Sequence, residues 1–470
     1  MTPNDLAGRH HAQGDGMTRG RLASAMVALL IWSLVACMPL PEDFLTPEGT
    51  TETPFPRVST ATPTDTRVPT ATPTHTPTAL PEATPSPTPL PLREICADGR
   101  EAVILIVDPE LQRGIRANLD RFEGDLCSEG YSVIERLSEI ATPEEVRGFL
   151  AGLYASTSGH LAGAILIGDV PYAYQYVTMV YANPDLAPLE GEAISFQYYS
   201  DLDGVFEASP GYASPGGHPH SYDVHTGAVD WEIWIGVLPL YKGDYDLTVE
   251  ALNRYFDKDH QYRAGSYTIP HGFLQINEHF HASSAQEHDT LMQGLIDGQY
   301  SWTPWSNTAI SHVYFDSPPG GLTVAQGYQQ LSAGVADVTV GDAHGYWGAH
   351  GTIDIGWVER NPVNSVLFWS NGCAVGNLDY ADNFLTSILY SPTSTVLVAK
   401  GTTNDSGGMG NNQNGSFGHN VATALSNGES VGEALLDHVN IPLIDPWSGS
   451  REFHFGTAII LGDPTLRLRP

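Results

Sequence analysis

The chain has 470 residues and a formal net charge of −33, from 21 Lys and Arg against 54 Asp and Glu. This length allows one or two domains with a sizeable core. The acidity argues against nucleic-acid binding, which needs clustered basic residues to neutralise phosphates. We interpret it as a solvated exterior, with attraction for cations or basic substrates as the alternative.

The first 37 residues have the pattern of an export signal. The basic stretch MTRGR, which begins at Met17, precedes the apolar run 22–36, and the run ends in Leu-Val-Ala-Cys37. Such a pattern is typical of secretory signals. The LVAC segment resembles a bacterial lipoprotein box, which implies cleavage before Cys37 and its lipidation. Met17 is an alternative start. An uncleaved anchor or plain secretion remain open, although the run is short for a spanning helix.

Residues 38–92 are rich in Pro and Thr, as in TPTDTRVPTATPTHTPTALPEATPSPTPLP. This composition cannot bury a core and favours extended polyproline conformations. We therefore predict a disordered stalk that is suited to O-glycosylation and lifts the folded part off a membrane.

Apolar runs alternate with amphipathic segments through the rest of the chain. The predicted strands are 102–107, 131–134, 163–169, 232–238, 272–277, 311–315, 366–369, 395–399 and 458–461. The predicted helices are 111–127, 142–157, 245–262, 287–297, 322–333, 384–390, 417–426 and 430–438. This alternation predicts a doubly wound α/β fold, and residues 171–229 form a long irregular insertion.

Two of the apolar runs end in side chains that suit nucleophilic catalysis. One ends at His350-Gly351, and the run 366–369 leads to Gly372-Cys373. Ligands bind beyond the carboxyl ends of strands in open α/β sheets, so these runs are expected to bring an imidazole next to a thiol. Histidine can activate a thiol near neutral pH. The N–H of Gly351, a residue without a Cβ, could approach a substrate oxyanion.

The sequence leaves the identity of the histidine open. A second pair, His344-Gly345, follows the apolar residues Val338 and Val340 and could end the same strand. We take His350 as the candidate base and His344 as the alternative, with the other histidine in a structural or pocket role.

The order of these motifs resembles the gingipain family of cysteine peptidases, which has the caspase-like fold. The HG pair, the apolar strand ending in Cys373 and the following Gly376-Asn377 carry this resemblance. Further similar segments occur in the same order: AILIGD at 164–169, YYSDLDG at 198–204, DWEIWIG at 230–236 and LGDPTLRLR at 461–469. The resemblance extends from about residue 101 to the end. The run Trp347–His350 and the later Trp357 are the features that favour His350.

The resemblance implies a fold and a set of roles. It implies caspase/gingipain-like, mostly parallel sheets in two α/β subdomains, 93–245 and a catalytic 246–470. Cys373 would be the nucleophile, and the N–H groups of Gly351 and Cys373 would hold the oxyanion. An acidic residue near the strand at 232–238 orients the histidine in the family, and Glu232 is preferred here over Asp230. The strand ends in Gly-Val237, whereas relatives often have Gly-Arg, so the role of that Arg has no counterpart.

The remaining cysteines and acidic residues give weaker signals. Cys96 and Cys127 flank the first predicted strand and helix, and they are a possible disulfide in an exported protein. This leaves Cys373 unpaired, either reactive or buried and inert. Asp201 and Asp203 lie in a YSDLDG turn that suits Ca²⁺, although such residues also cap turns.

Histidine-rich segments at 216–225 and 279–288 could hold a transition metal, but exposed loop histidines are the commoner explanation. We expect no cofactor for the chemistry.

The leading hypothesis is a surface-tethered cysteine endopeptidase that acts on protein or peptide substrates and meets a membrane only through its lipid anchor. The alternative is a non-catalytic binding lipoprotein on the same fold. A metallohydrolase that uses the loop histidines is a third, weaker hypothesis. For specificity, the resemblance implies an acidic pocket for Arg or Lys.

Overall fold

The structure is a computed structural model. It describes residues 92–96, 101–138, 142–179, 189–266, 269–277, 311–314, 324–404, 419–440 and 456–468, all of which belong to one compact unit. The export signal with Cys37, nearly all of the stalk and the helix expected at 287–297 lie outside these residues. No helix in the described ranges is long and apolar enough to cross a membrane.

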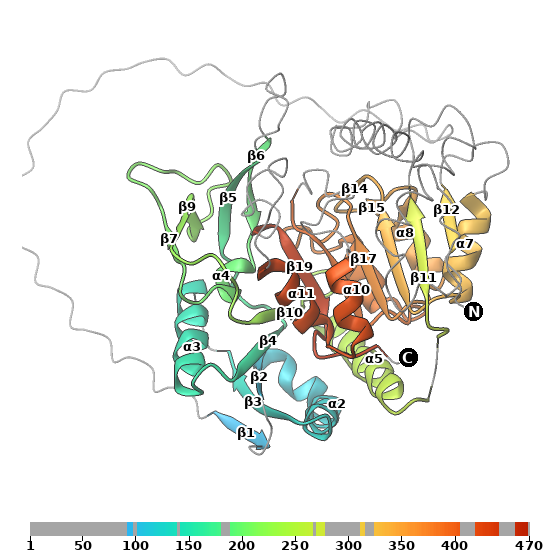
Figure 1. The fold of residues 1–470 in the computed structure, drawn as a ribbon, viewed down its shortest axis with the longest axis horizontal. Helices are drawn as coiled ribbons and strands as arrows, with labels where there is room; N and C mark the ends of the chain where they lie inside the picture. The colour runs from blue at the N-terminus through green and yellow to red at the C-terminus, as the bar shows by residue number, and fades with distance from the viewer. Residues whose placement is uncertain are drawn as a thin grey trace, which may run out of the picture. The chain divides into compact units, whose positions relative to one another are not determined.

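An 11-stranded sheet forms the centre of the fold (Figure 1). Its strands, in spatial order, are β1 (Arg93–Cys96), β3 (Tyr131–Leu137), β2 (Glu101–Val107), β4 (Leu161–Ile167), β10 (Trp234–Leu238), β19 (Ala458–Gly462), β18 (Val398–Thr402), β17 (Leu367–Ser370), β13 (Val338–Asp342), β11 (Phe273–Asn277) and β12 (Ser311–Tyr314). Most neighbouring strands are parallel, as the sequence predicts for a doubly wound α/β protein.

The sheet contains two antiparallel pairs, β1 with β3 at its edge and β18 with β19 at its centre, and the sequence does not reveal the central one. Strand β19 runs parallel to β10 but antiparallel to β18. Apart from β1, the strands on the β10 side therefore point opposite to those on the β17 side. As a consequence, the amino end of β10 and the carboxyl ends of β17 and β13 lie at the same edge of the sheet. Strands that precede and strands that follow residue 245, the expected boundary between two subdomains, belong to this one sheet.

Within the part of the chain that the structure describes, three small sheets accompany the large one. They consist of β5 (Tyr174–Met179), β6 (Leu189–Ile194) and β8 (Ser221–Tyr222); of β7 (Val205–Glu207) and β9 (Val224–Thr226); and of β14 (Gly345–Tyr346), β15 (Ala349–His350) and β16 (Ile353–Asp354). The first two lie within the insertion expected to be irregular. The third follows β13 directly and carries His350.

The helices follow from their caps and apolar faces. They are α2 (Pro109–Ser128), α3 (Pro143–Ser156), α4 (Gln197–Ser200), α5 (Tyr245–Arg263), α7 (Val324–Ala333), α8 (Ile355–Arg360), α9 (Phe384–Tyr390), α10 (His419–Ser426) and α11 (Val431–Asn440). Helix α3 begins with a capping box between Thr142 and Glu145, with Pro143 in the first turn. Helix α2 packs on α5 so closely that a Cβ on Gly114 would lie 2.7 Å from Val249 Cγ1.

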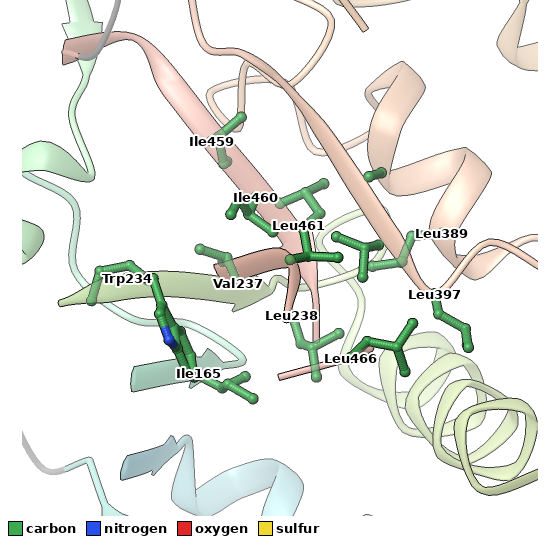
Figure 2. Close-up of a cluster of buried hydrophobic side chains, with 14 of the residues drawn as sticks. Ile165, Trp234, Val237, Leu238, Leu389, Leu397, Ile459, Ile460, Leu461 and Leu466 are labelled. Carbon is green, nitrogen blue, oxygen red and sulfur yellow. The ribbon is translucent and has the colours of Figure 1, made fainter. Parts of the chain in front are cut away.

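The core is continuous where the two halves of the sheet meet. Figure 2 shows Trp234 and Val237 of β10 beside Ile460 and Leu461 of β19, all of them almost fully buried. A Cβ on Gly163 would lie 2.2 Å from the Trp234 indole, so the neighbouring strand leaves room for this ring only because it carries a glycine. The cluster ties both directions of the sheet into one packed core.

The structure joins Cys96 and Cys127 in a disulfide with an S–S distance of 2.01 Å. The bond links β1 to the end of α2, and it is the pair that the sequence left as a possibility. Arg93 on the same strand bonds to Glu135 at 2.7 Å, so the first strand is held covalently and by an ion pair.

Candidate active site

Cys373 follows the carboxyl end of β17 in a loop that is held on both sides. Asn371 N–H donates to the Gly341 carbonyl at 2.8 Å, and Ala374 N–H donates to the Asn404 carbonyl at 2.7 Å. Ala374 has a φ of 54°, a left-handed conformation that costs a residue with a side chain on the order of 1 kcal/mol or more. The chain therefore makes a constrained turn directly after Cys373, whose side chain is 4% exposed.

Only a thiolate acts as a nucleophile or a metal ligand. The buried position of Cys373 in this loop therefore means that any nucleophilic chemistry there needs a base close enough to take the proton of the thiol.

His344 lies two residues beyond the end of β13, the strand that pairs in parallel with β17. It is partly buried. The residue after it, Gly345, lies against the loop that carries Cys373: a Cβ there would be 3.0 Å from the nitrogen of Cys373 and 2.8 Å from its carbonyl oxygen. The two neighbouring strands thus deliver a histidine segment and a cysteine segment to one place, as expected from the sequence.

His350 lies in β15 and is completely buried. A Cβ on Gly341 would meet its Cε1 at 2.4 Å, and its ring stacks on Phe384 at a centroid distance of 5.8 Å. Neither ring nitrogen has a hydrogen-bond partner. Burial lowers the pKa of His350 to about 4. His350 therefore makes no hydrogen bond to Cys373 in this structure.

The Gly351 N–H does not face the site as expected. Gly351 adopts a φ of 57°, and its N–H donates to the His344 carbonyl at 2.6 Å. The β14–β15 hairpin causes this, because it folds the chain back so that the residue after His350 meets the residue before Gly345. The expectation that the Gly351 N–H is an open oxyanion donor is wrong for this structure.

Glu232 does not orient His350. It precedes β10, and its carboxylate accepts a hydrogen bond from the Leu202 N–H. Although the reversal in the sheet places it at the same edge as Cys373, strands β19 and β18 separate β10 from β17. Three strand spacings amount to about 14 Å, which is too far for contact with the histidine segments beyond β17.

Glu232 instead joins the two aspartates that the sequence singled out. Ligand atoms of Asp201, Asp203 and Glu232 all lie within 4.8 Å of one another. Both oxygens of Asp201 already accept hydrogen bonds, from Gly204 N–H at 2.6 Å and from His225 Nε2 at 2.7 Å. Burial and the neighbouring aspartates raise the pKa of Glu232 to about 7. Asp201 therefore caps the turn, which is the alternative to Ca²⁺ binding given above. The turn also places two carboxylates beside that of Glu232.

The insertion histidines have separate partners. His218 stacks on Tyr174 at 3.6 Å, and His220 Nδ1 lies 2.9 Å from Glu144. No group of metal ligands in the described residues contains either of them. His279, His281 and His288 lie outside these residues.

Exposed aromatic side chains beside the site are a feature that the sequence analysis missed. Tyr346, Trp347 and Tyr380 are 43%, 38% and 45% exposed. The rings of Trp347 and Tyr380 stack at 4.8 Å with an angle of 8° between their planes. The sequence analysis used Trp347 only as part of a motif. Its exposure could not be predicted, because hydrophobic periodicity does not show which aromatic residues of a loop remain exposed.

Known proteins resemble this chain in fold. No family model and no curated protein sequence matches it. Two structures of similar fold are the Arg-specific cysteine proteinase gingipain R (15% identity, TM-score 0.53, 79% of this chain and 78% of that chain) and a complex of the pro- and mature domains of Porphyromonas gingivalis RgpB (15%, 0.51, 78% and 80%). A third, described as a protease, has 13% identity and a TM-score of 0.53 over 78% of both chains. The fold is therefore gingipain-like and caspase-like, a mixed α/β fold around a large, mostly parallel sheet.

Proposed function

We propose that the chain is a cysteine-type endopeptidase with Cys373 as its nucleophile. One observation carries the proposal: the adjacent parallel strands β13 and β17 lead to His344-Gly345 and Gly372-Cys373, and Gly345 lies against the backbone of Cys373. The fold shared with cysteine proteinases supports the same reaction class.

We further propose His344, rather than His350, as the general base. A base must exchange protons with both the thiol and the leaving amine. His344 is partly exposed, whereas His350 is enclosed and has a pKa lowered to about 4. In this proposal His350 has a structural role beneath the nucleophile loop.

The reaction begins when His344 takes the proton of reduced Cys373. The thiolate attacks the scissile carbonyl carbon, and the carbonyl oxygen becomes an oxyanion. Collapse of this intermediate breaks the C–N bond as His344 protonates the departing amine, leaving a thioester that water then hydrolyses. Gly345, as the residue after the proposed base, replaces Gly351 as the candidate oxyanion donor together with Cys373.

The alternative is a binding protein that uses the same fold without catalysis. The absence of a hydrogen bond between His350 and Cys373 favours it. In that case the cysteine is a structural residue and does not form a reactive thiolate.

A single experiment separates the two. The full chain is incubated under reducing conditions with a fluorogenic peptide library and with iodoacetamide, beside the variant Cys373→Ala. The double variant Cys96→Ala/Cys127→Ala provides a background in which the other described cysteines cannot react. A peptidase shows cleavage and fast labelling that both disappear in Cys373→Ala. Cleavage that persists in Cys373→Ala contradicts the assignment, and a slow thiol without cleavage favours the binding protein.

We also propose export and anchoring at a bacterial cell surface through a lipid on Cys37. The support is the basic and apolar pattern of residues 17–36 and the Pro/Thr-rich segment 38–92. Fractionation of cells that express the wild type and Cys37→Ser tests this, because the variant should leave the membrane fraction. Retention of Cys37→Ser in the membrane would contradict lipid anchoring.

A structural Ca²⁺ is proposed at Asp201, Asp203 and Glu232. Carboxylates are the hard ligands that Ca²⁺ prefers, and a cation would relieve the repulsion that contributes to the raised pKa of Glu232. Calcium should raise the melting temperature of the wild type but not of Asp203→Asn, with Asp246→Asn on α5 as the control. An equal response of all three proteins would exclude the site.

A further inference from the structure

The described surface carries few exposed large apolar side chains, and the aromatic ones among them are concentrated in one place. Outside this place, the exposed residues of this kind in the described ranges are Leu92, Val205, Leu247 and Val335. The exposed aromatic residues of the described ranges are Tyr346, Trp347 and Tyr380, which we call the aromatic platform. Exposed aromatic clusters are unfavourable in water, so they often mark binding surfaces.

The platform is an ordered group of rings. Trp347 and Tyr380 stack at 4.8 Å, and Tyr346 meets Trp347 edge-on at 5.8 Å with an angle of 89°. The backbone holds the pair together as well, because Phe384 N–H donates to the Trp347 carbonyl at 2.6 Å. Rings held in this way lose little conformational entropy when they bind a ligand.

The platform belongs to the same two segments as the proposed catalytic residues. Tyr346 ends strand β14 and Trp347 begins the turn of the β14–β15 hairpin, directly after His344-Gly345. Tyr380 lies seven residues after Cys373. A peptide whose scissile bond lies at Cys373 therefore has this ring surface within a few residues of the bond.

The nearby charges already have partners. Asp379 accepts a hydrogen bond from the Tyr174 hydroxyl at 2.7 Å. Asp382 accepts one from Ser387 Oγ at 3.1 Å and lies 3.7 Å from Lys242 Nζ. The platform thus offers ring surface rather than an unsatisfied carboxylate, which matches an apolar side chain better than a basic one.

We propose that Tyr346, Trp347 and Tyr380 form a specificity subsite that binds a large apolar or aromatic side chain of the peptide substrate. This inference rests on the proposed peptidase function. It predicts a preference for apolar side chains, whereas an acidic pocket would prefer Arg or Lys.

The test compares peptides that differ at one position in turn, with Phe, Ala or Arg on either side of the scissile bond. Wild-type full chain should cleave the best Phe peptide about 10- to 100-fold faster in kcat/KM than its Ala counterpart. The variants Trp347→Ala and Tyr380→Ala should lose this ratio while still cleaving the Ala peptide. The control Leu247→Ala removes an exposed apolar side chain of α5 and should keep the ratio.

Two outcomes overturn the subsite: cleavage without a preference for Phe, including a preference for Arg, or an equal loss of activity on all peptides in the platform variants. If no peptide is cleaved, the peptidase proposal fails separately. In that case, calorimetry measures the affinity of Cys373→Ala for the Phe and Ala peptides. The subsite is supported if the Phe peptide binds more tightly and this difference disappears in the double variant Cys373→Ala/Trp347→Ala. Equal affinities for the two peptides reject it.

Discussion

The imidazole of His350 lies directly behind Gly372, the residue before Cys373: a Cβ on Gly372 would approach His350 Cδ2 to 2.8 Å. Gly341, at the end of the neighbouring strand, faces the same ring. The histidine that the motif pattern favours as a base is therefore enclosed by the two strands that support the site. Its position explains why both of these residues are glycine.

The enclosure gives a stability prediction. Gly341→Ala should destabilise the protein by about 1–3 kcal/mol, because the new methyl group overlaps the His350 ring, which is held against Phe384 and cannot move freely. Urea unfolding measures the change. The matched control is Gly148→Ala in α3, where nothing lies within 4 Å of the added Cβ, and alanine should stabilise the helix. Equal effects of the two variants would contradict the close contact.

Substitutions of His344 and His350 should have different effects on kcat and on the melting temperature. We expect His344→Ala to lower kcat by about 10²–10⁴-fold with little change in melting temperature, as for loss of a general base. His350→Asn should lower the melting temperature but keep most of the activity below that temperature. Steady-state kinetics with thermal melts measures both. The reverse pattern, with activity lost only in His350→Asn, would restore His350 as the base.

Stability should fall in mild acid because His350 is buried in its neutral form. The native pKa of about 4 lies below the ordinary value of 6.5. Between these values the unfolded chain binds a proton that the native state does not, so stability rises with pH across this window. The difference amounts to about 3 kcal/mol for one group. Urea unfolding midpoints are measured from pH 4 to 7. They should rise less steeply with pH in His350→Asn than in the wild type. In the control His160→Asn, which replaces an exposed histidine, they should rise as steeply as in the wild type.

Much of the fold could be predicted from the sequence because the signals are local. Apolar runs such as 102–107 and helix starts such as Thr142-Pro143 specify their own elements, and β2 and α3 lie where expected. The reversal between β19 and β18 has no such signal. Strand direction there depends on a pairing between residues about 60 positions apart, and no periodicity records it.

The site shows the same division. The motifs correctly bring a histidine segment and Cys373 together, since both follow neighbouring strands. They do not identify which HG pair reaches the cysteine, because the answer depends on a hairpin of only two residues per strand. The role expected for Glu232 failed for a related reason: its distance from His350 is set by two strands that come much later in the chain.

Glu232 should make stability depend on pH, because its carboxylate is partly buried beside Asp201 and Asp203. Its pKa of about 7 lies above the ordinary 4.5, so the native state keeps a proton that the unfolded chain releases, and stability falls as pH rises through this window. Glu232→Gln retains an oxygen for the Leu202 N–H but carries no charge. We compare the free energies of unfolding of Glu232→Gln and wild type in calcium-free buffer. The difference should favour the variant more at pH 8 than at pH 5, while kcat stays unchanged. A large loss of kcat in Glu232→Gln would instead show that this carboxylate acts on the catalytic histidine, despite the strands between them.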